Sequence, residues 1–203
     1  MRFDRRVLAL VAVAVFTSIV FASVFVYYPA WVTVSPVQPP VYFATGSNAN
    51  QQDLGPNNTI GVSLGPNSAS LAITIHPTYQ VSYYKDIVRI VNGDSSKVYY
   101  AYLRVYTAAT GLPDGSQLVL YVYSKGASRS LSGYQPPTPV SGTYLASLDL
   151  ITATSQKFPI TISAGSPVEI DLYVYIPEGS TPPASVTAKL LLVYTTSSTE
   201  TPP

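Results

Sequence analysis

Few residues of this chain could do acid–base or metal chemistry. His76 is the only histidine, it stands directly before Pro77, and the chain has no cysteine. Zinc sites of the usual kinds need several histidine or cysteine ligands at short spacing. We therefore interpret His76 as a turn or rim residue, and the sequence predicts no catalytic residue, no metal ligands and no enzyme.

Nine carboxylates follow residue 30, and most are expected on turns and outer strand faces. They are Asp53, Asp86, Asp94, Asp114, Asp149, Glu169, Asp171, Glu178 and Glu200. Glu169 and Asp171 are two residues apart, which places both on one face of a strand, where they could act as acid and base or bind calcium. Solvated strand surface is the simpler interpretation. No cofactor is predicted, and calcium is kept as an alternative.

A covalent modification is predicted at one asparagine. Asn57-Asn58-Thr59 is the only acceptor sequence for N-glycosylation in the chain. Asn57 is therefore a candidate glycan site if the chain is exported.

The composition favours strands over helices. Only 10% of residues are charged, whereas Tyr contributes 17 residues and Pro 18, and an average soluble domain has about 25% charged residues. Valine, isoleucine, threonine and tyrosine fit a pleated surface.

After residue 30 the chain has eight basic and nine acidic residues, a net charge of −1, which gives no basis for nucleic-acid binding. Without disulfides, robustness must come from core burial or assembly.

The first 22 residues have the layout of a secretory signal peptide. A basic head at 1–6 (MRFDRR) precedes an uncharged apolar run at 7–22, and Val20-Phe21-Ala22 offers a cleavage site. The apolar run continues to Tyr28, so a retained transmembrane anchor over 7–28 is the alternative. In both cases the rest of the chain is predicted to be secreted or held at the cell surface. The chain would then contact the membrane only during export or through the retained anchor.

Residues 23–34 are predicted to form a strand whose partner lies in another molecule. Its even positions are mostly apolar, which is the period-two pattern of a strand. Pro36, Pro39 and Pro40 then impose an extended linker, so that no hairpin partner follows directly. An unpaired apolar strand is an aggregation hazard, and donation to a neighbouring subunit's sheet would remove it. The predicted interface residues are Val24, Val26, Tyr28, Val32 and Val34. Pairing within its own domain, as a first strand, is the alternative.

The segment 41–195 is predicted to be an all-β domain, an antiparallel two-sheet, jelly-roll-like β-sandwich. Strands are expected at 41–44, 59–64, 70–75, 80–91, 98–106, 117–124, 144–150, 158–162, 168–176 and 185–195. In 168–176 the even aliphatic residues should face the core, and Glu169, Asp171, Tyr173 and Tyr175 the solvent. Residues 125–142 are predicted to be a loop, and 196–203 a disordered tail.

Parts of this sequence resemble a known family. The block Tyr83–Asn92 (YYKDIVRIVN), the later turn Ile162-Ser163-Ala164-Gly165 and the strand that follows it resemble the TasA/camelysin-like surface-fibre proteins. With the N-terminal segment, the chain is most similar to archaeal bundling-pilus and thread subunits of that type, over about residues 23–195. The resemblance implies a jelly-roll subunit that is exported by a signal peptide and polymerises by donating an N-terminal strand. Camelysin's name implies metalloprotease activity, for which this chain has no zinc-ligand motif.

The predicted function is therefore structural. We expect a homopolymer that forms an extracellular filament, a pilus or thread, for adhesion, bundling or biofilm formation. A membrane-anchored surface-layer or adhesion module is one alternative. A calcium-dependent, cannula-like tube subunit is another.

Overall fold

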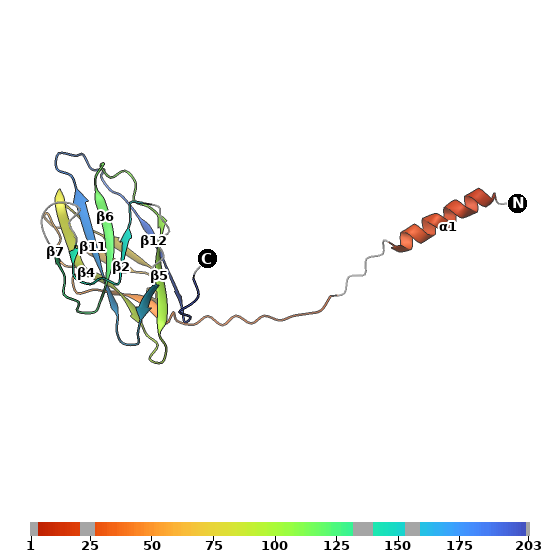
Figure 1. Ribbon diagram of the computed structural model, residues 1–203, viewed down its shortest axis with the longest axis horizontal. Coiled ribbons are helices and arrows are strands. Elements are labelled where there is room, and N and C mark those ends of the chain that lie inside the picture. The colour runs from red at the N-terminus through yellow and green to blue at the C-terminus, as the bar shows by residue number, and fades with distance from the viewer. Residues whose placement is uncertain (1–3, 21–26, 132–139, 153–158, 202–203) are drawn as a thin grey trace. The chain divides into compact units, whose positions relative to one another are not determined.

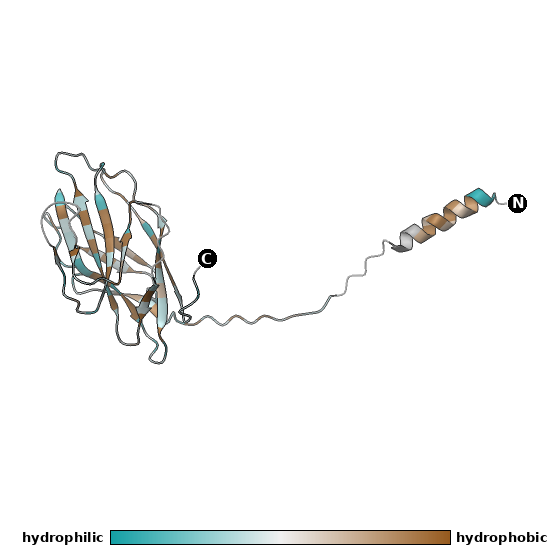
Figure 2. Cartoon of the chain, viewed as in Figure 1, coloured by the Kyte–Doolittle hydropathy of each residue, from teal (hydrophilic) through white to brown (hydrophobic). Residues whose placement is uncertain are grey.

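The structure is a computed structural model that describes residues 4–20, 27–131, 140–152 and 159–201. The chain divides into two compact units, Met1–Val37 and Gln38–Pro203. In the first unit, helix α1 (Arg5–Val20) begins with two arginines and continues as an apolar run, which Figure 2 shows as a hydrophilic end and a hydrophobic body. Within the described ranges, no helix is both long and apolar enough to cross a membrane. Part of the predicted anchor, residues 21–26, lies outside those ranges.

The second unit is an all-β sandwich, as the sequence predicts (Figure 1). One sheet has five strands in the order β1-β4-β11-β6-β9, and the other has three in the order β10-β5-β12, with antiparallel neighbours throughout. The strands are β1 (Val41–Thr45), β4 (Gln80–Asn92), β5 (Tyr99–Thr107), β6 (Gln117–Ser124), β9 (Ala146–Asp149), β10 (Pro159–Ile162), β11 (Val168–Ile176) and β12 (Lys189–Thr195). The chain changes sheets at β4–β5–β6 and again along β9–β10–β11–β12. This repeated crossing is typical of Greek-key sandwiches.

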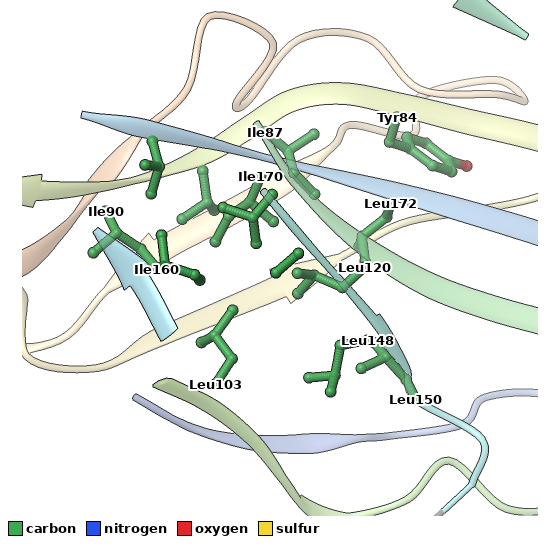
Figure 3. Packing of buried hydrophobic residues seen from close by; sticks show 14 of the residues in the cluster. Tyr84, Ile87, Ile90, Leu103, Leu120, Leu148, Leu150, Ile160, Ile170 and Leu172 are labelled. Atoms are coloured by element: carbon green, nitrogen blue, oxygen red, sulfur yellow. The ribbon is translucent and has the colours of Figure 1, made fainter. Parts of the chain in front are cut away.

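The two sheets share one apolar core. Figure 3 shows aliphatic side chains gathered in it, among them Leu120 and Ile170 from the five-stranded sheet and Leu103 and Ile160 from the three-stranded sheet. All four are at most 4% exposed. The predicted alternation holds for this inner face, where the even residues of β11 are buried.

Two short hairpins complete the domain. Strands β2 (Gly61–Leu64) and β3 (Leu71–Thr74) pair around the 3-10 turn η1 (Pro66–Ser68). Strands β7 (Ser130–Leu131) and β8 (Val140–Ser141) pair within the segment predicted to be entirely loop. That prediction was wrong at these positions, because two-residue strands are too short to leave a periodic signal.

A bulge interrupts the long strand β4. The register between β4 and β11 shifts between Ile170 and Leu172, and Asp86 takes a positive φ of 43°. The backbone of Gly46 lies against this bulge so closely that a Cβ there would be 2.0 Å from the Asp86 carbonyl oxygen. A side chain at position 46 is therefore excluded by sterics. β-Bulges often change the direction in which a nearby side chain points.

Candidate functional site

The segment that the sequence predicts as a donor strand is exposed where the structure describes it. Residues 27–39 have no strand or turn assignment. Tyr28, Val32 and Val34 are 86%, 87% and 79% exposed, while the predicted interface residues Val24 and Val26 lie outside the described ranges. Apolar side chains at this exposure are ready to be buried by another surface.

Pro29 restricts how this segment could pair. Proline has no backbone N–H and is confined within sheets to edge strands, strand starts and bulges. Pro29 stands between Tyr28 and Ala30 in the middle of the segment. A strand formed by 23–34 can therefore pair continuously on one side only, which fits addition to a sheet edge.

The β12 edge of the three-stranded sheet is the open side of the core. Leu190, Leu192 and Tyr194 of β12 pack against the core, but each is only half-buried. At the other edge of the same sheet, Ile160 and Ile162 of β10 are at most 1% exposed. Among the described residues, β12 pairs with β5 alone. A strand added at β12 would therefore bury apolar surface, whereas β10 has almost none left to bury.

The edges of the five-stranded sheet are covered more fully, although Phe43 of β1 is half-buried against the core. Val41 of β1 is 2% exposed, and Ala146 and Leu148 of β9 are 5% and 2% exposed. Among the described residues, the other row of half-buried side chains that pack on the core is at β3: Leu71 and Ile73, continued just past its end by Ile75. With about 4.8 Å per strand, the three-stranded sheet is roughly 10 Å narrower than its partner. That difference in width leaves the β12 side of the core incompletely covered.

The prediction that Glu169 and Asp171 face solvent is wrong. Glu169 is 5% exposed, Asp171 is 0% exposed, and Tyr173 on the same face is 1% exposed. Arg129, from the loop after β6, binds both carboxylates, with its Nε 2.6 Å from Asp171 Oδ2 and its Nη2 2.8 Å from Glu169 Oε2. The loop backbone also donates from Gly126 N–H to Glu169 Oε1 at 3.1 Å. The loop covers this face of β11 and excludes solvent from it.

Further groups extend this buried charge network. Asp86 accepts hydrogen bonds from Arg89 Nε at 2.9 Å and from the Ser47 backbone at 3.0 Å, and its own N–H donates to Asp171 Oδ1 at 2.7 Å. Tyr83 donates its hydroxyl proton to Asp171. Burial by itself would raise the pKa of Asp86, but the hydrogen bonds from Arg89 and Ser47 outweigh it and hold that pKa below 3.8. The network fastens the bulge and the covering loop to the sheet.

Sequence reasoning missed Arg129 because its signal is not local. Arg129 lies in a Ser- and Gly-rich stretch that is typical of a loop, and nothing in its spacing points to Asp171. Arg129 lies over the ring of Tyr123 at 4.7 Å. Tyr123, Tyr173 and Val140 form a second small buried cluster on this face. An excess of tyrosines on the outer face of β6 and β11 was the available hint of a covered surface.

His76 takes part in a separate carboxylate pair. Its Nδ1 lies 3.0 Å from Asp53 Oδ2, and its backbone N–H donates to the same oxygen at 2.7 Å. Burial opposes ionisation of Asp53, but backbone hydrogen bonds from Leu54 and His76 lower its pKa below the ordinary 3.8. His76 also lines an open pocket of about 330 Å³ with Asn58 and Tyr79. The pair joins the segment before β2 to the segment between β3 and β4.

One sequence pattern could suggest a serine nucleophile. Gly61-Val62-Ser63-Leu64-Gly65 has the Gly-x-Ser-x-Gly spacing, although the sequence interpretation held that no serine lies in a Gly-x-Ser-x-Gly elbow. A nucleophile elbow places its serine on a sharp turn between a strand and a helix. Ser63 instead lies inside strand β2, opposite Ala72 of β3. The pattern therefore lacks the geometry of an elbow.

The remaining candidates are accessible or occupied by protein groups. Asn57 is exposed on a loop with a φ of 63°, a conformation that asparagine tolerates, so glycosylation there stays a prediction. In the described ranges, no group of three or more His, Asp or Glu side chains is placed to hold a metal ion. The Glu169–Asp171 pair faces Arg129.

The fold and these surfaces define an all-β sandwich protein with a half-open core edge at β12 and an exposed apolar segment before the domain. The chain matches no known family model and no curated protein.

Proposed function

We propose that this chain is an exported structural subunit that polymerises into an extracellular filament. Each copy would donate residues 23–34 to the β12 edge of the next copy. The observation that carries the proposal is that the chain holds two complementary apolar parts, an exposed segment and a half-buried row on β12. The filament would be a homopolymer for adhesion, bundling or biofilm formation.

The physical basis of the junction is strand addition. An incoming strand satisfies the backbone N–H and C=O groups along a free edge, and alternate side chains enter the core. Tyr28, Val32 and Val34 of one copy would cover Leu192 and Tyr194 of the next. Full burial of one such side chain contributes about 1.5–3 kcal/mol, so several of them would make a durable joint.

Export precedes assembly in this proposal. The arginines at the start of α1 would stay inside the cell, and cleavage near Ala22 would free Ser23 as the new N-terminus. N-terminal sequencing of protein from the cell surface tests this step. A chain that starts near Ser23 supports the filament, whereas an intact Met1 or Arg2 supports a membrane-anchored adhesion module.

A complementation experiment tests the junction itself. Deletion of residues 23–34 removes the donor and leaves the β12 edge, whereas Leu192→Lys damages the edge and leaves the donor. We expect each variant alone to be monomeric, and their mixture to give heterodimers that grow no further. Analytical ultracentrifugation and negative-stain electron microscopy measure both outcomes. Filaments formed by the deletion variant alone would rule the proposal out.

Matched controls separate the junction from general damage. Thr33→Lys adds a charge to the donor's odd face, and Leu191→Lys adds one to the outer face of β12, where Leu191 is already 41% exposed. Both controls should still polymerise, while Val32→Lys should not. Equal loss of filaments in Thr33→Lys and Val32→Lys would contradict a strand that buries one face.

A further inference from the structure

The last residues of the proline linker are fastened to the sandwich. Gln38 Nε2 donates to Asn67 Oδ1, in η1, at 3.1 Å. The Pro40 carbonyl accepts from the Gly93 backbone N–H at 2.8 Å. Pro39 and Pro40 are also half-buried. The chain just before β1 is therefore held by contacts that its extended conformation provides.

The linker itself resists reversal. Pro36, Pro39 and Pro40 have φ fixed near −65°, and the residues before each proline are kept out of the helical region. The structure assigns no turn to residues 35–39. At about 3.1 Å per residue in the polyproline conformation, residues 35–40 span roughly 19 Å without folding back.

Without this stiffness, closure on the same chain would be the easier reaction. Connections between strands in compact domains are commonly 2–6 residues long, and the linker 35–40 is of that length. A segment tethered by a short flexible linker has an effective concentration of roughly 1 mM, about 10³-fold above subunits at micromolar concentration. A flexible linker would therefore let each copy fill its own β12 edge and remain a monomer.

We infer that residues 35–40 are a stiff spacer that keeps the donor segment out of its own β12 edge and so makes a second copy of the chain the partner. The inference rests on the proposed function. It assigns the prolines and Gln38 a role in the choice between self-closure and polymerisation, in addition to spanning the distance to the next copy. The prolines and Gln38 determine which copy of the chain receives the strand, and the contacts of the strand itself stay the same.

A loosened variant, Pro36→Gly/Gln38→Ala/Pro39→Gly, tests the spacer. We expect its monomer fraction at micromolar concentration to rise at least tenfold over wild type in sedimentation velocity. Pro182→Gly/Pro183→Gly, two glycines in a loop far along the chain, is the matched control and should polymerise like wild type. A loosened variant that polymerises as fully as this control overturns the inference.

Peptide binding shows whether a monomer has closed on itself. A lysine-tagged peptide of residues 23–34 should bind the deletion variant, whose β12 edge is free, and should bind the loosened monomer at least tenfold more weakly. Equal binding to both overturns self-closure. Pro36→Gly alone, which leaves the half-buried Pro39 and Pro40 intact, repeats the test with little risk to folding, and no rise in its monomer fraction also counts against the spacer.

The two proposals fail in different ways. If the deletion variant still forms filaments, the proposed function is wrong. If the deletion variant is monomeric and the loosened variants polymerise normally, the donor junction stands and only the spacer is lost.

Discussion

Strand β11 is buried on both faces, whereas strand β12 is half-open toward the same core. Around β11 the chain uses a loop, a short hairpin and Arg129 to cover an outer face that carries Glu169 and Asp171. Around β12 the inner side chains Leu190 and Leu192 have no equivalent cover in the described residues. The domain thus buries the polar outer face of β11 at some cost in desolvation, yet leaves the apolar side chains of the β12 edge partly exposed.

This difference indicates that the two regions serve different ends. A buried, hydrogen-bonded charge network fixes one arrangement of the loop and the bulge within a single copy. A half-covered apolar row is stabilised only when something else covers it. On the proposed function, the charge network is complete in the monomer, whereas the β12 edge is completed by assembly.

The largest effect is expected at Arg129. Its side chain is 1% exposed. Arg129→Met would leave Asp171 buried without its cation and Glu169 with only Arg89 at 4.0 Å, and an uncompensated buried charge typically costs about 3–5 kcal/mol of unfolding free energy. Guanidinium denaturation of the purified chain measures this loss. The control Lys125→Met, at an exposed position of the same loop, should change the unfolding free energy by no more than about 0.5 kcal/mol. Equal values for the two variants would mean that the network does not hold the loop.

Leucines that face each other across β5 and β12 sharpen the comparison. Leu103 and Leu192 are register partners, but Leu103 is 4% exposed and Leu192 is half-buried. In the donor-deleted monomer, Leu103→Ala should cost about 2–5 kcal/mol, and Leu192→Ala clearly less. In the filament, Leu192→Ala should lower the temperature of disassembly more than it lowers the melting temperature of the monomer. A cost in the monomer equal to that at Leu103 would show the β12 edge to be complete already.

Acid should lower the stability of the sandwich. The folded-state pKa values of Asp86 and Asp53 lie below their ordinary 3.8, so their contribution to stability is fully present above that pH and is lost as the pH falls through the lowered values. Unfolding free energy measured from pH 6 down to pH 2 should therefore drop below about pH 4. Asp86→Asn should be less stable at pH 6 and should show a shallower drop. An unchanged slope in that variant would remove Asp86 from the acid response.

The smallest effect is expected where the chain's tail contacts the three-stranded sheet. Composition predicts a disordered tail, and in the structure Tyr102 donates its hydroxyl to the Glu200 carbonyl at 2.8 Å while the Thr195 hydroxyl donates to Glu200 Oε2 at 3.0 Å. Tyr102→Phe should cost about 0.5–1.5 kcal/mol and speed hydrogen exchange at 196–201. Tyr106→Phe, at a residue 68% exposed, should change neither quantity.

Much of the fold could be predicted because strand period and turn chemistry are local. Eight strands of the two main sheets fall at or within two residues of segments marked by alternating apolar residues, apart from the late start of β12. Only part of the candidate site could be predicted from the sequence. The apolar pattern of 23–34 is local and visible, but the half-open state of Leu190 and Leu192 depends on how many strands each sheet has, which no local pattern contains.

The sequence by itself determined that this chain makes strands, has no cysteine and a single histidine, and carries an apolar segment with a proline linker before its domain. Only the tertiary structure decided that Asp171 is buried against Arg129, because those two residues are 42 positions apart and meet through a loop with no regular pattern. It also decided which edge of the core stays open, since exposure at an edge is a property of the packed sheets and not of any one strand.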